Sequence, residues 1–475
     1  MLEQAQNILW LLILIGVMIM IHELGHFWAA RYFDVKVETF SLGFGPRLFG
    51  FKRGETDYRI SLILFGGYVK MAGEQFADMT APGAGPSPDS EVPETRSETG
   101  AGMMTARRDF AASLSGTDPR HLLNKPRWQR LIIAFAGPFM NIVLAVGVLT
   151  GIYMVKFEKL ADANAEPVIG HVVAGSPAAK AGVQDGDKIV TLNGQPNPTW
   201  EALIMQAIEN RPMSITVDRS GRRITTTVVP TLDKSSGVGY AGWDEQGAVE
   251  IGDVRPDYPA AKAGIKKGDV VLAVNGRPIH STARFHEITK NSSGSTVTIE
   301  YQRGGQTQTA AIQPVFAKLE GQDQQWMIGV SIQTKLNIVT TKLSFPDAFA
   351  ESIRENAKGA LFFVNVLEGM VERRMSTKNL TGPIGLSQIA GQEAREGPMA
   401  YLSLMVMVSL QLAVLNLMPI PILDGATILM LLIEIVMQRD LSLSVKEAMF
   451  KVGFVFIMML VAFVIYNDLS KMLPQ

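Results

Sequence analysis

The residues with the clearest chemical potential are His22, Glu23 and His26, which form the pattern H-E-x-x-H within the apolar stretch MIMIHELGHFWAARY (18–32). On a helix, His22 and His26 lie one turn apart on the same face, so both imidazoles can reach one metal ion. Zinc is the metal that this pattern predicts, with Glu23 taking a proton from a water bound to it. The alternative is a polar helix face that packs against other helices. It is disfavoured because ionisable groups within a membrane span are costly and usually functional.

The third ligand of this site must come from elsewhere, because catalytic zinc takes three protein ligands and keeps one position open. The chain has no cysteine, and the best candidate is Asp424 in NLMPIPILDGATILM (416–430). Pro419 and Pro421 each lack an N–H and disfavour helix at the preceding residue, so we expect the chain to unwind just before Asp424. Unwound backbone at membrane depth is tolerated where it lines a wet cavity, as an active site would. Taken alone, Asp424 could also belong to a simple Asp-Gly turn at a helix end.

Four apolar stretches are long enough to cross a bilayer, which takes about 20 residues. They cover residues 8–30, 131–155, 399–423 and 448–466. The first is expected to be a retained span and not a signal peptide, since no Lys or Arg precedes it and no convincing cleavage site follows. A hydrophobic fraction of 47% and a mean hydropathy of +0.16 suit a chain that is partly in the membrane and partly in water. The net charge of −1 gives no electrostatic case for nucleic-acid binding, so we expect none.

Basic residues predict the orientation of the spans, because cytoplasmic loops carry an excess of Lys and Arg. The N-terminal tail has none, whereas the loop between the first two spans carries Arg31, Lys36, Arg47, Lys52, Arg53, Lys125, Arg127 and Arg130. This loop is therefore predicted to be cytoplasmic, and the long segment 156–398 is predicted to be extracytoplasmic.

The chain is predicted to divide into eight segments, some of them recognised by composition alone. Residues 74–127 are rich in Pro, Gly, Ser, Glu and Thr, which predicts a disordered cytoplasmic linker. A helix over 346–374 is amphipathic and either packs on neighbours or lies on the membrane surface. The segments are a first transmembrane helix with H-E-x-x-H (1–35), a membrane-associated β-hairpin region (36–73), the linker (74–127), a second transmembrane helix (128–157), two repeated domains (158–245 and 246–335), a connecting region with the amphipathic helix (336–398), and the third and fourth transmembrane helices with Asp424 (399–475).

An internal repeat defines the two middle domains. PAAKAGVQDGDKIVTLNGQP (177–196) recurs as PAAKAGIKKGDVVLAVNGRP (259–278). Each copy is typical of a short helix ended by glycine, a strand and an Asn-Gly turn. The pattern resembles bacterial PDZ domains, which bind extended peptides or C-termini by adding a strand. Residues 236–242 and 326–332 are candidates for the carboxylate-binding loops, or are simply strands that contain glycine.

These motifs together resemble the site-2 protease family of zinc intramembrane proteases, in particular the bacterial type that regulates sigma-E. The resemblance rests on H-E-x-x-H in the first span, a downstream N-x-x-P-x-P-x-L-D-G and PDZ-like repeats between them, and it covers nearly the whole chain. It implies that His22, His26 and Asp424 bind Zn²⁺ and that Glu23 is the general base. It also implies that Asn416 lies beside the substrate backbone, although Asn416 could instead hydrogen-bond between helices.

The resemblance also implies an architecture and an activity. The fold class is a polytopic α-helical membrane protein with four transmembrane helices, a membrane-associated β-sheet and two tandem PDZ-like β-sandwich domains. The implied location is the bacterial inner membrane, with the PDZ-like domains periplasmic and the active site towards the cytoplasm. The implied substrate is a single-span membrane protein, such as an anti-sigma factor or a remnant signal peptide, already cut by an upstream site-1 protease. We expect a monomer whose PDZ-like pair either binds the new C-terminus or excludes bulky substrates.

The family's cytoplasmic sheet implies substrate contacts near residues 40–71. A transmembrane substrate must unwind before cleavage, because its helix hides the peptide carbonyls in hydrogen bonds. An edge strand at 58–65, with Tyr58, Ile60 and Leu62, could pair with the unwound segment. Gly43 and Gly45 would allow the turns of this sheet.

The remaining polar residues are given structural roles. FAGPFMN (135–141) resembles the family's second span, where Gly137 and Pro138 would serve packing and a kink, and Asn141 would be a polar packing residue. Four further histidines lack ligand spacing and are expected on the surface or in packing: His121, His171, His280 and His286. Two other functions compete with proteolysis inside the membrane: a non-catalytic PDZ scaffold, and a tethered metalloprotease whose H-E-x-x-H helix lies outside the bilayer.

Overall fold

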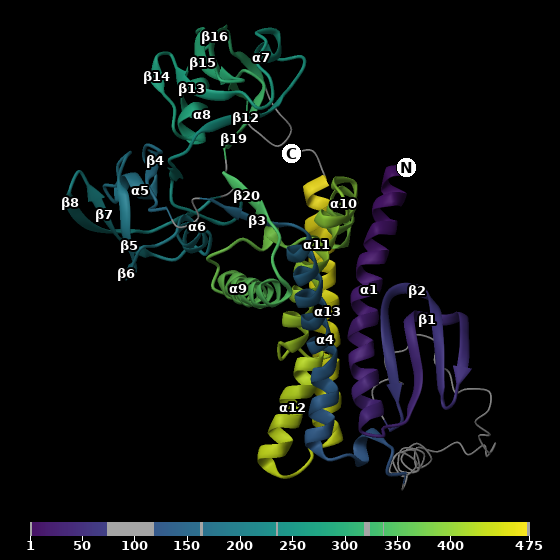
Figure 1. Ribbon diagram of the computed structural model, residues 1–475. Coiled ribbons are helices and arrows are strands. Elements are labelled where there is room, and N and C mark those ends of the chain that lie inside the picture. The colour runs from purple at the N-terminus through teal and green to yellow at the C-terminus, as the bar shows by residue number, and fades with distance from the viewer. Residues whose placement is uncertain are drawn as a thin grey trace. The chain divides into compact units, whose positions relative to one another are not determined.

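The computed structural model describes residues 2–73, 118–161, 165–233, 236–317, 324–335 and 337–472 (Figure 1). These residues fall into two compact units. A helical unit is drawn from Met1–Lys156, Lys342–Val364 and Leu380–Leu473, and a β-rich unit from Phe157–Thr341 and Asn365–Asn379. Most of the predicted linker, residues 74–117, lies outside the described residues.

Among the described residues, four helices of the helical unit are long and apolar enough to cross a membrane, which confirms the four predicted spans. They are α1 (Leu2–Tyr32), α4 (Arg127–Val155), α11 (Pro398–Leu417) and α13 (Leu443–Met472). Helix α4 contacts both α1 and α11. Leu14 and Met18 of α1 are buried in one cluster with Leu404 and Met405 of α11. Apolar side chains of α13, such as Phe454 and Met459, are exposed, as expected for a helix that faces lipid.

The predicted third span, 399–423, is too long. Helix α11 ends at Leu417, and a separate helix, α12 (Asp424–Met437), begins after the non-helical residues 418–423. Pro419 and Pro421 interrupt the helix as expected, since neither can donate a backbone hydrogen bond. Hydropathy alone did not reveal α12, because its apolar sequence continues that of α11.

The helical unit also contains α10 (Pro383–Glu396), the short 3₁₀ turn η1 (Leu122–Asn124) and most of α9 (Phe345–Val371). The end of α9 and the 3₁₀ turn η2 (Thr377–Asn379) belong to the β-rich unit. The first half of α9 packs on α4 through small and polar residues. Ser352 is fully buried and hydrogen-bonds to Thr150 at 2.8 Å. The predicted apolar face is not used for this packing, because Phe349 and Ile353 are exposed.

Strands β1 (Val37–Arg53) and β2 (Thr56–Met71) form a sheet in which each strand is bent and pairs twice. Residues 57–60 pair with 39–42 on one side and with 49–52 on the other. The prediction that 58–65 is an edge strand is therefore wrong for Tyr58 and Ile60, and the outer segments are 47–53 and 67–71. Gly43 and Gly45 have positive φ values of 92° and 87°, which allow the bend.

The β-rich unit contains the two sequence repeats, each with its own core. The first repeat comprises β4 (Ile169–Val172), α5 (Pro177–Lys180), β5 (Lys188–Leu192), β6 (Gln195–Pro196), α6 (Trp200–Ile208), β7 (Met213–Arg219), β8 (Arg222–Val228), β9 (Thr231–Leu232), β10 (Gly239–Tyr240) and β11 (Trp243–Glu245). The second comprises β12 (Val249–Val254), α7 (Pro259–Lys262), β13 (Val270–Val274), β14 (Arg277–Pro278), α8 (Thr282–Lys290), β15 (Val297–Arg303), β16 (Gln306–Ile312), β17 (Val315–Ala317), β18 (Gln325–Met327) and β19 (Val330–Thr334). The flanking strands β3 (Phe157–Leu160) and β20 (Ile338–Thr341) pair with each other.

Both repeats contain the same ion pair between a buried aspartate and a partly exposed arginine, so the sequence repeat is also a structural one. Asp187 accepts from Arg219 Nε at 2.7 Å, and Asp269 accepts from Arg303 Nε at 2.6 Å. Each aspartate is 1% exposed and lies just before the strand of its repeat motif. Each pair joins that strand to the next one in its sheet, β5 to β7 and β13 to β15.

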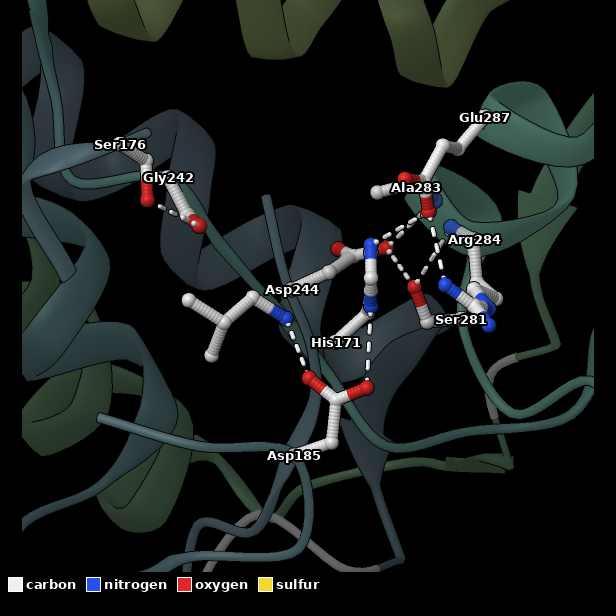
Figure 2. A network of polar contacts seen from close by, with 10 residues as sticks. His171, Ser176, Asp185, Gly242, Asp244, Ser281, Ala283, Arg284 and Glu287 are labelled. Atoms are coloured by element: carbon white, nitrogen blue, oxygen red, sulfur yellow. Dashed lines mark hydrogen bonds and ion pairs between the residues drawn. The ribbon is translucent and has the colours of Figure 1, made fainter. Parts of the chain in front are cut away.

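The two repeats meet at a polar junction (Figure 2). Asp244 of β11 accepts hydrogen bonds from the Ser281 and Thr282 hydroxyls and from the Ala283 N–H, so one repeat caps the helix α8 of the other. The buried His171 lies between Asp185 and Glu287, with its ring nitrogens 3.1 Å from each carboxylate. Because the unmet N–H groups of a helix start need acceptors, Asp244 ties the fold of α8 to the first repeat.

We predict that Asp269→Asn weakens the second repeat in a pH-dependent way. Burial alone would raise the pKa of the Asp269 carboxyl, but hydrogen bonds from Arg303 and the Lys266 N–H outweigh it and lower the pKa. A carboxyl group whose pKa is lower in the folded state than in the unfolded chain stabilises the fold at pH values above its unfolded-state pKa. This stabilisation is lost as the pH falls through the folded-state pKa. The substitution should cost about 1–3 kcal/mol at pH 7, and the difference should narrow below about pH 4.

Hydrogen exchange of the second repeat in the full chain, followed from pH 7 to pH 3, measures this effect. Asp257→Asn, at an exposed position of the same repeat, is the control and should change nothing. An equal loss of stability at both pH values would contradict the ion-pair explanation.

A second prediction concerns the junction. Asp244→Ala should loosen the first turn of α8 by about 1–2 kcal/mol, as loss of a helix cap does. Faster hydrogen exchange at the amides of residues 283–285 would report it. Unchanged exchange there would mean that Ser281, which also caps α8 through Arg284 N–H, is sufficient by itself.

Candidate metal centre

The three predicted ligands come together from two helices. His22 and His26 lie on α1, and Asp424 is the first residue of α12. His22 Nε2 is 3.0 Å from Asp424 Oδ2, His26 Nε2 is 3.5 Å from Asp424 Oδ1, and the two Nε2 atoms are 3.2 Å apart. Among the described residues these three form the one group of this kind with metal-ligand geometry.

This arrangement fits a zinc ion. Two ligands of a tetrahedral zinc, each about 2.0–2.2 Å from the metal, lie about 3.3–3.5 Å from each other. The observed separations of 3.0, 3.2 and 3.5 Å are close to that value. Two imidazoles and one carboxylate are also a common ligand set for catalytic zinc, which keeps its fourth position open.

Helix α4 leaves room for the site at Gly137. A Cβ atom on this residue would lie 2.2 Å from His26 Nε2 and 2.8 Å from His22 Nε2. Any side chain at this position would therefore overlap the imidazole nitrogens that face Asp424. The expectation that Gly137 serves only helix packing was incomplete.

The outer ring nitrogens of His22 and His26, the Nδ1 atoms that point away from Asp424, contact α4. His26 Nδ1 donates to the Ile133 carbonyl at 2.8 Å, and His22 Nδ1 lies 3.2 Å from the side-chain amide of Asn141. The sequence predicted Asn141 as a polar packing residue; it is fully buried, and its packing partner includes the His22 ring. The available signal was its position one turn after Gly137 in an apolar span, where a polar group is costly.

Glu23 lies beside this group. It is half-buried, and its carboxylate is within electrostatic reach of His22, His26 and Asp424. The outer sheet segment 67–71 runs next to it, since a Cβ on Gly67 would lie 3.2 Å from Glu23 Cγ. An acid adjacent to the metal ligands and to an extended backbone segment is placed for proton transfer to a bound peptide.

The turn before Asp424 is fixed by close packing. A Cβ on Gly425 would lie 2.1 Å from the Met418 carbonyl oxygen, and one on Gly453 of α13 would lie 2.2 Å from Pro421. Ile422 has a φ of 84°, which is costly for a β-branched residue. The packing around the turn holds this conformation, and it determines where the Asp424 carboxylate points.

The other predicted site residues are more dispersed. Asn416 is half-buried in the last turn of α11. Ile60 and Leu62 are 43% and 57% exposed, whereas Tyr58 is half-buried and stacks on Phe51.

A cavity of about 990 Å³ lies in the β-rich unit, lined by α8, by residues 325–332 and by His171 and Val173 of the first repeat. It includes the candidate loop 326–332.

Comparison with known proteins identifies the family. The model of peptidase family M50 matches residues 10–460. The regulator of sigma E protease of Salmonella typhi is 27% identical over 99% of this chain and all of its own length, and the regulator of sigma-E protease RseP of Escherichia coli is 27% identical over 97% of this chain and 98% of its own. A protein of Neisseria meningitidis described as a zinc metalloprotease is 29% identical over 96% of this chain and 97% of its own.

The chain therefore belongs to peptidase family M50, the site-2 protease family, and is a metalloprotease. Among solved structures, the PDZ domain of an SdrC-like protein from Listeria monocytogenes is 26% identical over 18% of this chain and 85% of its own, with a TM-score of 0.16. A TM-score this low does not establish the fold of the repeats.

We predict that Gly137→Ala removes the metal without touching a ligand. The added methyl group would occupy the space between the two Nε2 atoms, so the purified chain should lose most of its bound zinc by elemental analysis. Gly147→Ala on the same helix is the control. A Cβ there meets nothing within 4 Å, so zinc should stay bound and the helix should gain slightly in stability. Full zinc content in Gly137→Ala would contradict this geometry.

Proposed function

We propose that this chain is a zinc-dependent intramembrane endopeptidase that cleaves single-span membrane proteins. The observation that carries the proposal is the convergence of His22, His26 and Asp424 between helices of the membrane-spanning unit. These groups would be costly inside a bilayer without a cation to share. A tethered enzyme of the soluble type would place them outside the apolar helix, whereas His22 lies within α1 and is 7% exposed.

In the proposed hydrolysis, different residues would bind the zinc ion and transfer the proton. When bound, zinc supplies Lewis-acid activation of water and of the scissile carbonyl. His22, His26 and Asp424 would hold the ion, and Glu23 would take a proton from the attacking water and deliver it to the leaving amide nitrogen.

Substrate binding is proposed for the sheet and for the end of α11. A substrate helix must unwind, and its freed N–H and C=O groups then need partners at membrane depth. Since Tyr58 and Ile60 already pair on both sides, the proposed site of strand addition is the outer segment 47–53, which pairs with β2 on one side. The exposed Ile60 and Leu62 side chains, beside the bend at Gly43 and Gly45, would contact apolar side chains of the substrate. Asn416 would hydrogen-bond to the substrate backbone.

The two repeats are proposed to be tandem PDZ-like domains on the periplasmic side of the bacterial inner membrane, with the active site towards the cytoplasm. Their matching ion pairs support a common fold for the two repeats. The cavity between α8 and residues 325–332 supports peptide binding at the second repeat. The relatives named as sigma-E regulators support an anti-sigma factor as substrate, with remnant signal peptides as a second class. A site-1 protease would make the first cut, and the enzyme would act as a monomer.

Glu23→Gln tests the proposal. Cleavage of a tagged single-span substrate truncated on its outer side should fall by about 100-fold or more, because the base is lost while both histidines remain. Cleavage of the co-expressed substrate is followed by immunoblot, and zinc content should stay unchanged.

Glu3→Gln is the matched control, since Glu3 lies on the same helix but is exposed and distant from the ligands. It should cleave as the wild type does. Equal processing by Glu23→Gln and wild type would remove Glu23 from catalysis and favour the non-catalytic scaffold.

A further inference from the structure

One stripe of α4 follows the metal site along its length. Ile133, Gly137 and Asn141 are spaced four residues apart, so they lie on the same face of the helix. Ile133 contacts the outer nitrogen of His26, Gly137 clears space between the two Nε2 atoms, and Asn141 contacts the outer nitrogen of His22. Ile133 and Asn141 therefore touch the two histidines on the side away from Asp424, while Gly137 lies beside the Nε2 atoms that face it.

The contact at His26 is chemically unambiguous. A backbone carbonyl can only accept a hydrogen bond, so the 2.8 Å contact with the Ile133 oxygen requires a proton on His26 Nδ1. In a neutral imidazole this leaves the lone pair on Nε2, which faces Asp424 at 3.5 Å. Ile133 thus selects the tautomer of His26 that binds metal.

The contact at His22 leaves two orientations of the amide. In the structure Asn141 turns Nδ2 towards His22 Nδ1 at 3.2 Å, and its buried Oδ1 has no hydrogen-bond partner among the described residues. The oxygen and nitrogen of an amide have nearly the same size, so the reversed amide fills the same space. Each orientation leaves one buried polar atom without a described partner, so packing does not choose between them.

The metal chooses. If His22 binds zinc through Nε2, its Nδ1 carries the proton and needs an acceptor, as a metal-bound imidazole generally has. We propose that Asn141 is a positioning residue for zinc, whose Oδ1 accepts from His22 Nδ1 and fixes the tautomer and ring angle of His22. This inference rests on the proposed function. The Ser409 hydroxyl donates to the backbone carbonyl of Asn141 at 2.9 Å, and both residues are fully buried, so the main chain that carries the amide is anchored to α11.

Two substitutions of similar size separate an acceptor from a donor. Asn141→Asp keeps an acceptor in the same place, and Asn141→Leu removes all hydrogen bonding. If the residue accepts, Leu should weaken zinc binding by about 10–100-fold, and Asp should bind within a few-fold of wild type. Affinity is measured by chelator competition on the purified full chain. The visible spectrum of the cobalt-substituted chain reports the ligand geometry, which a merely structural role would leave unchanged.

Asn356→Leu is the matched control. Asn356 is a buried asparagine of the same unit, bonded to the Ser352 carbonyl on α9 and distant in sequence from the ligands. It should alter stability but not zinc affinity or the cobalt spectrum.

The outcomes distinguish this inference from the proposed function. Wild-type zinc affinity in Asn141→Leu, alongside loss of zinc in His22→Ala, overturns the role of Asn141 and leaves the metal site intact. Weaker binding in Asn141→Asp than in Asn141→Leu overturns the acceptor assignment, because a carboxylate would then face a lone pair. Equal zinc affinity in wild type and His22→Ala instead overturns the proposed metal site itself.

Discussion

The arrangement of the helical unit depends on holding one carboxylate and two imidazoles together inside a bundle of apolar helices. His22 and His26 are fixed relative to each other by the helix repeat, but Asp424 arrives from a part of the chain 398 residues beyond His26. Helix α4 contacts both α1 and α12, so it sets the distance between the two halves of the site. Helix α4 contacts the ligands at three positions: the Ile133 carbonyl, Gly137 and the Asn141 side chain.

The far end of α12 is fixed by charge. Glu434 is fully buried and accepts from Lys446 of α13 at 2.7 Å, while Arg130 of α4 lies 3.7 Å from its second oxygen. A buried carboxylate without partners would be strongly destabilising, so this end of α12 is held against α4 and α13. The close turn at Gly425 fixes the other end. Asp424 is thus presented by a helix that is restrained at both termini.

The β-rich unit combines independent cores with a shared boundary. Each repeat has its own apolar core and its own buried aspartate paired with an arginine, so each has the internal contacts of a separate domain. The junction is different, because Asp244 of the first repeat completes the helix start of the second. Since α8 lines the cavity of the second repeat, the shape of that cavity depends on a residue of the first.

The sequence by itself determined the features that follow from local periodicity and composition. H-E-x-x-H places two imidazoles on one helix face, the two prolines before Asp424 interrupt the helix, hydropathy marks the four spans, and self-similarity marks the repeats. Tertiary structure alone decided that α12 is a separate helix, that Tyr58 lies inside the sheet, and that Asn141 faces His22. These features depend on contacts between residues far apart in the chain, such as the 119 positions between His22 and Asn141. Local pattern carries no record of such pairings, because only packing brings the partners together.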